Sequence, residues 1–158
     1  MNKTWMVGAL LLAACGGQTV TLAPSPGPEY ALQEFMAAVA DSNLPKMAEY
    51  WGTAKGAAGE IGKPADYPKR IEVMQLWLRG YSYRILASTP TDAGLTGQQM
   101  AVELARGDCR KQVPFLAVKT RSDRWVIQSI DLNAVGSPMM PCFDTTGGPR
   151  GRQGTNPG

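Results

Sequence analysis

The chain has 158 residues, the size of one domain and too short for two domains of ordinary size. Its 16 Lys and Arg residues and 13 Asp and Glu residues give a formal net charge of +3, too weak a field to indicate a nucleic-acid partner. The chain has no histidine, which is the usual general base near neutral pH and the commonest metal ligand. The composition therefore argues against a histidine-based triad and a zinc site, and it indicates no cofactor.

Residues 1–14 are typical of a signal peptide. Lys3 supplies a positive charge, and residues 6–14 form an apolar run that ends in small residues. A membrane-spanning helix needs about 20 apolar residues, so this run is too short to span a bilayer. The run closes with Leu12, Ala13, Ala14 and Cys15, which resembles the lipobox of bacterial lipoproteins.

The lipobox resemblance implies that Cys15 becomes the first residue of the mature chain and carries a thioether-linked diacylglycerol. Acyl chains stabilise membrane binding by about 0.8 kcal/mol per buried CH₂, enough to anchor a domain permanently when two or more are present. The next residue, Gly16, is not the aspartate that retains lipoproteins at the inner membrane. The resemblance thus implies the periplasmic face of the outer membrane. The alternative is an ordinary secretory signal followed by an unrelated cysteine.

Residues 15–27 are expected to form the lipidated end and a flexible tether, because small residues, Gly and Pro dominate them. Three helices should follow, since apolar residues recur at helical spacing after an N-cap residue or a proline. Between the second and third, Gly and Ala dominate residues 52–63, which predicts a loop with little core content. The expected buried faces are Leu32, Phe35, Met36 and Val39 in the first helix (residues 28–41, begun by Pro28), Leu44, Met47, Ala48 and Trp51 in the second (residues 43–52, capped by Asn43), and Tyr67, Ile71, Met74 and Leu78, widened by Val73 and Trp77, in the third (residues 66–80, capped by Asp66).

After Gly80 the apolar period changes from 3.6 to 2, which predicts β-strands. Three helices followed by four strands indicate an α+β domain in which the helices cover one face of a curved antiparallel sheet. The domain should occupy residues 28–143, and residues 144–158 have no apolar side chain to bury and are expected to be disordered. The four predicted strands are residues 81–85, 100–104, 113–119 and 125–132.

The order of elements and several short motifs resemble the NTF2-like superfamily, the cystatin-like α+β cone fold, over most of residues 28–132. The motifs are residues 35–39, 43–47, 100–104 and 123–127. The resemblance implies a non-catalytic module that binds a partner protein or a small apolar ligand. It leaves open an enzyme of the isomerase, dehydratase or hydrolase type, and a purely structural component of the cell envelope.

Enzymes of this superfamily use a carboxylate or histidine inside the cone, and Asp131 is the candidate here. It shares strand alternation with Trp125 and Ile127, so it could face inward as a base with a raised pKa. The alternative is that Asp131 sits exposed at a strand end. No residues match the paired Asp and His of the family's dehydratases.

Two further groups of side chains could form binding surfaces. Aromatic residues could line a cavity between the third helix and the sheet, although such side chains more often pack in the hydrophobic core. Basic residues near the third and fourth strands could meet anionic lipid headgroups or an acidic partner, or form a solvated edge. The aromatic set is Trp51, Trp77, Tyr81 and Tyr83, and the basic set is Arg106, Arg110, Lys111, Lys119, Arg121 and Arg124.

Cys109 and Cys142 are expected to form a disulfide. Export places them in an oxidising compartment, and the predicted hairpin register could bring Cys142 back onto Cys109. A closed loop of this size stabilises by roughly 4 kcal/mol in the chain-entropy model. The sharper alternative is a reactive or metal-binding thiol, but neither cysteine has a CxxC neighbour.

Overall fold

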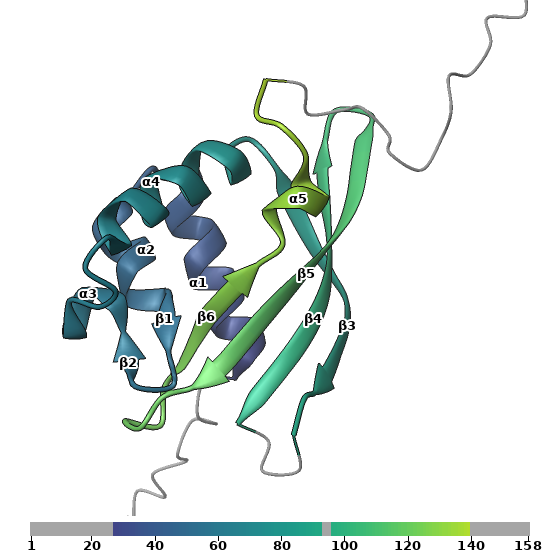
Figure 1. The fold of residues 1–158 in the computed structure, drawn as a ribbon. Helices are drawn as coiled ribbons and strands as arrows, with labels where there is room; N and C mark the ends of the chain where they lie inside the picture. Colours follow the sequence, from purple (N-terminus) through teal and green to yellow (C-terminus); the bar gives the residue numbers. More distant parts are fainter. Residues whose placement is uncertain (1–26, 93–95, 140–158) are drawn as a thin grey trace, which may run out of the picture.

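The computed structural model describes residues 27–92 and 96–139 (Figure 1). Helices lie on one face of a four-stranded antiparallel sheet, so the predicted α+β class is confirmed. The predicted signal peptide, Cys15, nearly all of the tether and the tail lie outside the described residues. In chain order the elements are α1 (Pro28–Ala40), α2 (Leu44–Tyr50), β1 (Gly52–Thr53), β2 (Gly56–Ala57), α3 (Ala58–Ile61), α4 (Tyr67–Leu78), β3 (Ser82–Pro90), β4 (Gly97–Arg106), β5 (Cys109–Lys119), β6 (Trp125–Ile130) and α5 (Leu132–Val135).

The three longer helices, α1, α2 and α4, correspond to the predicted ones, and each has a proline in its first turn. Asn43 caps α2 as expected, because its side-chain oxygen accepts a hydrogen bond from the backbone N–H of Lys46 at 3.0 Å. Asp66 precedes α4 without capping it. Its carboxylate instead accepts a hydrogen bond from Arg70 Nε at 3.0 Å. The buried faces agree with the prediction in part: Leu44, Tyr67 and Trp77 are partly buried against the core, and Val73 of α4 is 45% exposed.

The segment predicted as a loop with little core content, residues 52–63, forms the β1–β2 hairpin and α3. Ala57 and Ala58 are completely buried. The small residues matter because they permit close backbone contact: a Cβ added to Gly52 would lie 2.8 Å from the Cα of Ala57. The prediction was wrong because Gly and Ala are common where two backbone segments pack closely together as well as in loops.

The sheet has the strand order β3-β4-β5-β6, and its strands differ in length from the prediction. β3 continues to Pro90, which pairs with Gln98, and β5 begins at Cys109, which pairs with Arg106. The polar and turn-forming residues at these ends pair with their neighbours despite their low strand propensity. β6 ends at Ile130, earlier than predicted.

Two strands each carry an extra residue, Leu86 in β3 and Gln128 in β6. A bulge of this kind reverses the alternation of side chains beyond it. Ile127 therefore pairs with Ala117 and Ile130 with Phe115, and both isoleucines contact the core.

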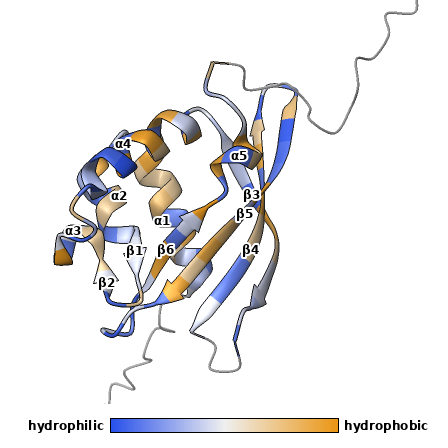
Figure 2. Ribbon diagram, viewed as in Figure 1, coloured by the Kyte–Doolittle hydropathy of each residue, from blue (hydrophilic) through white to orange (hydrophobic). Residues whose placement is uncertain are grey.

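One hydrophobic core joins the helices to the sheet. α1 packs on β5 and β6, and Leu32, Phe35 and Phe115 have no exposed surface. α4 carries apolar and polar stretches, as expected for a helix with one buried side (Figure 2). A smaller cluster forms on the opposite face of β5 and β6, where Ala57 of β2 covers Val118 and Val126.

Replacing Phe115 by Ala should lower the free energy of unfolding by about 3–5 kcal/mol, because it leaves a cavity beneath α1. Urea denaturation measures the loss. The matched control is Leu86→Ala, since Leu86 is 45% exposed at the β3 bulge. The control should change the stability by less than about 0.5 kcal/mol. Equal losses in the two variants would contradict the strand register.

Candidate functional site

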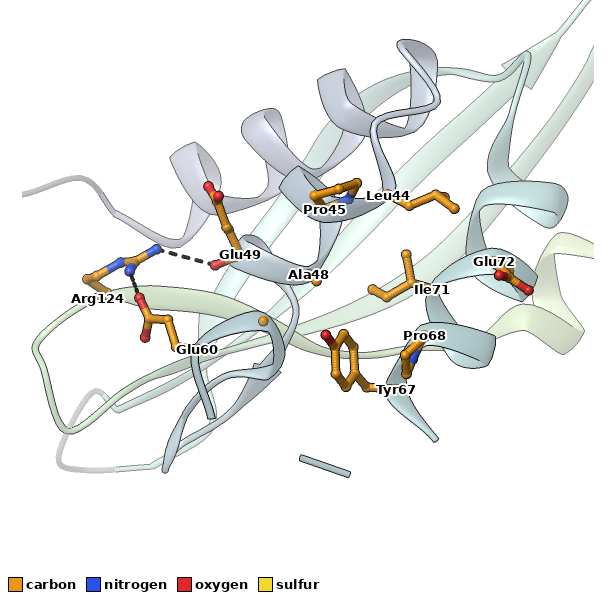
Figure 3. Close-up of a pocket in the computed structure, with 11 residues that line it drawn as sticks. Leu44, Pro45, Ala48, Glu49, Glu60, Tyr67, Pro68, Ile71, Glu72 and Arg124 are labelled. Carbon is orange, nitrogen blue, oxygen red and sulfur yellow. Dashed lines mark hydrogen bonds and ion pairs between the residues drawn. The ribbon is translucent and has the colours of Figure 1, made fainter. Parts of the chain in front are cut away.

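A groove of about 650 Å³ runs between α2, α3 and α4 (Figure 3). Ala48 and Ile71 are its most buried lining residues, at 4% and 1% exposure. Leu44 and Tyr67 are half-buried, and Pro45 and Pro68 complete the apolar lining. The volume lies in the range typical of ligand-binding clefts.

The same groove carries an excess of negative charge. Its lining contains the three carboxylates of Glu49, Glu60 and Glu72 against the single guanidinium of Arg124. Arg124 forms an ion pair with Glu60 and donates a hydrogen bond to the backbone oxygen of Glu49 at 3.3 Å (Figure 3). Within residues 27–92 and 96–139, Glu49 and Glu72 form no ion pair. The groove can therefore attract a cation at its rim.

Helical periodicity and one close approach give the groove its walls. Leu44 and Ala48 lie four residues apart on α2, and Pro68 and Ile71 lie three apart on α4, so each pair shares a helix face. The third wall, α3, meets α2 at Gly59, where a Cβ would make ordinary van der Waals contact, 3.4 Å from Ala48.

The predicted aromatic set does not gather in one cavity. Trp51 borders a separate hollow of about 340 Å³ between α4 and β6, and Tyr83 borders another beside Arg84 on the sheet. Trp77 packs against the core. Tyr81 is buried, with the Arg106 guanidinium 4.4 Å from its ring centre. Burial, followed by the charge of Glu34, raises the pKa of Tyr83 above its ordinary value.

Asp131, the catalytic candidate, does not face the core. The extra residue Gln128 reverses the alternation of β6, so Asp131 leaves the face that Ile127 occupies. Asp131 is exposed, and its Oδ1 accepts hydrogen bonds from the backbone N–H groups of Asn133 at 3.0 Å and Ala134 at 3.3 Å. The structure thus gives Asp131 the role of N-cap of α5.

The predicted basic set divides between opposite ends of β5. Arg106, Arg110 and Lys111 lie around the β4–β5 turn, whereas Lys119, Arg121 and Arg124 lie at the β5–β6 turn (Figure 1). The 11 residues of β5 separate the two groups by roughly 30 Å at the usual rise per residue. They therefore cannot act as one surface.

Of the predicted cysteine pair, the structure describes Cys109, which is half-buried at the start of β5. Cys142 lies outside the described residues, so the disulfide stays a prediction.

Compared with known families and curated proteins, the chain matches no family model and no curated sequence. Among the described residues, no helix is long and apolar enough to cross a membrane. The same residues contain no group of three or more Asp, Glu or Cys side chains placed to hold a metal ion.

Sequence reasoning missed the acidic groove. A partial signal exists, because Glu49 and Glu72 each follow a predicted apolar helix position directly. Nothing local connects Glu60 with Arg124, which are 64 residues apart.

A capping role for Asp131 makes a testable prediction. Asp131→Ala should lower the free energy of unfolding by about 1 kcal/mol, because two backbone N–H groups of α5 lose their acceptor. Asp131→Asn should restore most of the stability, since an amide oxygen caps about as well as a carboxylate. Thermal and urea denaturation measure both variants. A loss in Asp131→Asn as large as that in Asp131→Ala would mean that the negative charge, and not the cap, is what matters.

Proposed function

We propose that the protein is a lipid-anchored, NTF2-like module of the cell envelope that binds without catalysis. Its binding site is the groove between α2, α3 and α4, and its ligand is an apolar segment of a partner protein that carries Lys or Arg. The single observation behind this proposal is the combination of an apolar lining and net negative charge in one cleft.

The lining residues define the chemistry of the ligand. Apolar side chains placed over the half-buried Leu44 and Tyr67 would gain about 25 cal/mol for each Å² removed from water. The carboxylates of Glu49 and Glu72 are exposed at the rim, so they favour a cation without first having to lose an internal partner. An acidic segment would be repelled, which gives the groove its selectivity.

The exposure of the carboxylates favours binding over catalysis. A carboxylate that acts as a general acid or base usually lies in a buried, water-excluded site, whereas Glu49, Glu60 and Glu72 are all exposed. The buried set in the part of the chain that the structure describes contains one polar residue, Thr120. Within the described residues there is therefore no buried carboxylate that could serve as the catalytic group of an enzyme.

Two further observations support the remaining parts of the proposal. The order of three longer helices and then four antiparallel strands is compatible with an NTF2-like cone. The lipobox-like residues that end in Cys15 support lipid anchoring, and the absence of Asp at position 16 favours the outer membrane. The predicted disulfide between Cys109 and Cys142 fits the same proposal, because the periplasm is an oxidising compartment.

The anchoring prediction concerns the mature N-terminus. Protein isolated from the membranes of its own host should begin at Cys15, carry acyl chains and incorporate labelled palmitate. Intact-mass spectrometry measures the modification, and thiol alkylation of the unreduced sample reports the state of Cys109 and Cys142. Cys15→Ser should abolish labelling. A chain that keeps Met1, or an unmodified Cys15, would refute the anchor.

The groove prediction uses a defined probe, a synthetic peptide of alternating Lys and Leu, in an NMR titration with methyl-labelled protein. The methyl signals of Leu44 should shift on addition of this peptide, because its apolar side chains would contact the half-buried Leu44, and those of Ala48 and Ile71 on the floor of the groove should shift less. A peptide with Glu in place of Lys should bind at least about tenfold more weakly, because repulsion from the rim replaces attraction.

Two variants make the groove experiment specific. Glu49→Lys with Glu72→Lys should remove the preference for the basic peptide. A matched charge change outside the groove, Glu29→Lys with Asp41→Lys, should leave the preference intact because both residues are exposed and neither lines the groove. Equal binding of the two peptides, or shifts that avoid the groove, would overturn the proposed ligand.

A further inference from the structure

We propose that the end of the domain next to the tether docks on a lipid surface that carries anionic headgroups. This end, called the tether end below, consists of Gly27, the β1–β2 turn with Lys55, and the β5–β6 turn of residues 120–124 together with Lys119. The inference rests on the proposed lipidation of Cys15, and it adds a contact surface and an orientation to the anchor.

The structure joins the chain entry to the two turns. Gly27 lines a hollow of about 280 Å³ together with Asp123, Arg124 and Trp125, so the chain enters the domain beside the β5–β6 turn. The backbone N–H of Arg121 donates to the oxygen of Ala54 at 3.1 Å, which fastens the β1–β2 turn to the β5–β6 turn. Both turns lie at the lower end of the molecule in Figure 1.

The two turns of the tether end, with Lys119, carry four cations and one carboxylate, and a further exposed carboxylate, Glu29, lies beside Gly27. Lys55 and Arg121 are exposed and form no ion pair with any described residue. Lys119 pairs with Asp123 at 2.6 Å, and Arg124 pairs with Glu60. Lys55 and Arg121 are therefore the two cations that an anionic surface would meet first.

Because the tether is short, two cations that pair with no described residue are enough for the domain to dock on an anionic bilayer. Twelve peptide steps separate Cys15 from Gly27, so the chain between them can reach at most about 40 Å. A domain held this close has a high effective concentration at the bilayer, and a contact too weak for a free protein becomes populated. Charges within a Debye length, about 8 Å at physiological salt, then contribute directly.

Aromatic residues at the same end fit a lipid surface better than an acidic protein. Tyr30 is 42% exposed and packs edge-on against Tyr50, with ring centres 6.4 Å apart, and both line the hollow beside Gly27. Tyrosine is enriched where headgroups meet hydrocarbon, because its ring is apolar and its hydroxyl is polar.

Two of the three basic residues at the other end of β5 contact other side chains of the fold. Arg106 lies over the ring of Tyr81, and Arg110 approaches Glu103 at 3.7 Å. That group also lies a strand length away from Gly27, so the tether does not bring it to the bilayer.

The test uses the full lipidated protein in vesicles of phosphatidylcholine, with or without phosphatidylglycerol. Hydrogen exchange followed by mass spectrometry should show slower exchange of peptides that cover residues 54–56 and 119–124 in the anionic vesicles alone, and high salt should remove the protection. Lys55→Glu with Arg121→Glu should reduce the ratio of docked to undocked protein at least about 25-fold, or about fivefold for each cation lost.

The matched control reverses two other exposed cations, with Lys69→Glu on α4 and Arg79→Glu at its C-cap, and should keep the protection. Protection in neutral vesicles, or equal behaviour of the two double variants, would overturn the docking surface. Flotation with the vesicles separates the two proposals. A protein that floats without protection of the turns refutes docking alone, whereas one that does not float refutes the lipid anchor.

Discussion

The packing of α1 across β5 and β6 is the contact on which the other features depend. An antiparallel sheet with one apolar face needs a cover, and Leu32 and Phe35 provide it over Phe115. The short connection after α1 ends at Asn43, which caps α2, so α2 lies beside α1. Helix α4 then packs on α2. The groove is thus a consequence of how the helices cover the sheet.

Small residues determine how closely the parts of the groove approach. Gly52 lets the β1–β2 hairpin close, because a Cβ there would lie 2.8 Å from the Cα of Ala57. A larger residue at this position would displace the hairpin that leads directly into α3, the wall that carries Glu60. The stretch of Gly and Ala at residues 52–63 therefore shapes one wall of the groove.

The sequence predicted features that depend on local periodicity and missed those that depend on register. The buried residues of α1 follow from their spacing, and the cap at Asn43 follows from its side chain. The bulge at Gln128 has no local signature, yet it moved Asp131 from an expected inward position to an exposed cap. The groove was also missed, because Glu60 and Arg124 meet only in the folded chain.

Arg124 connects the tether end to the groove. It follows the β5–β6 turn in the sequence, and its guanidinium reaches both Glu60 of α3 and the backbone of α2 at Glu49. The Arg124 and Glu60 side chains are 43% and 44% exposed, so water screens the ion pair and it contributes at most about 1 kcal/mol. The proposed basic ligand meets the carboxylates of Glu49 and Glu72, and the proposed anionic surface meets the cations of Lys55 and Arg121, none of which forms an ion pair with a described residue. Neither contact requires the Arg124–Glu60 pair to break, so this pair can hold the tether end against the groove while both sites are occupied.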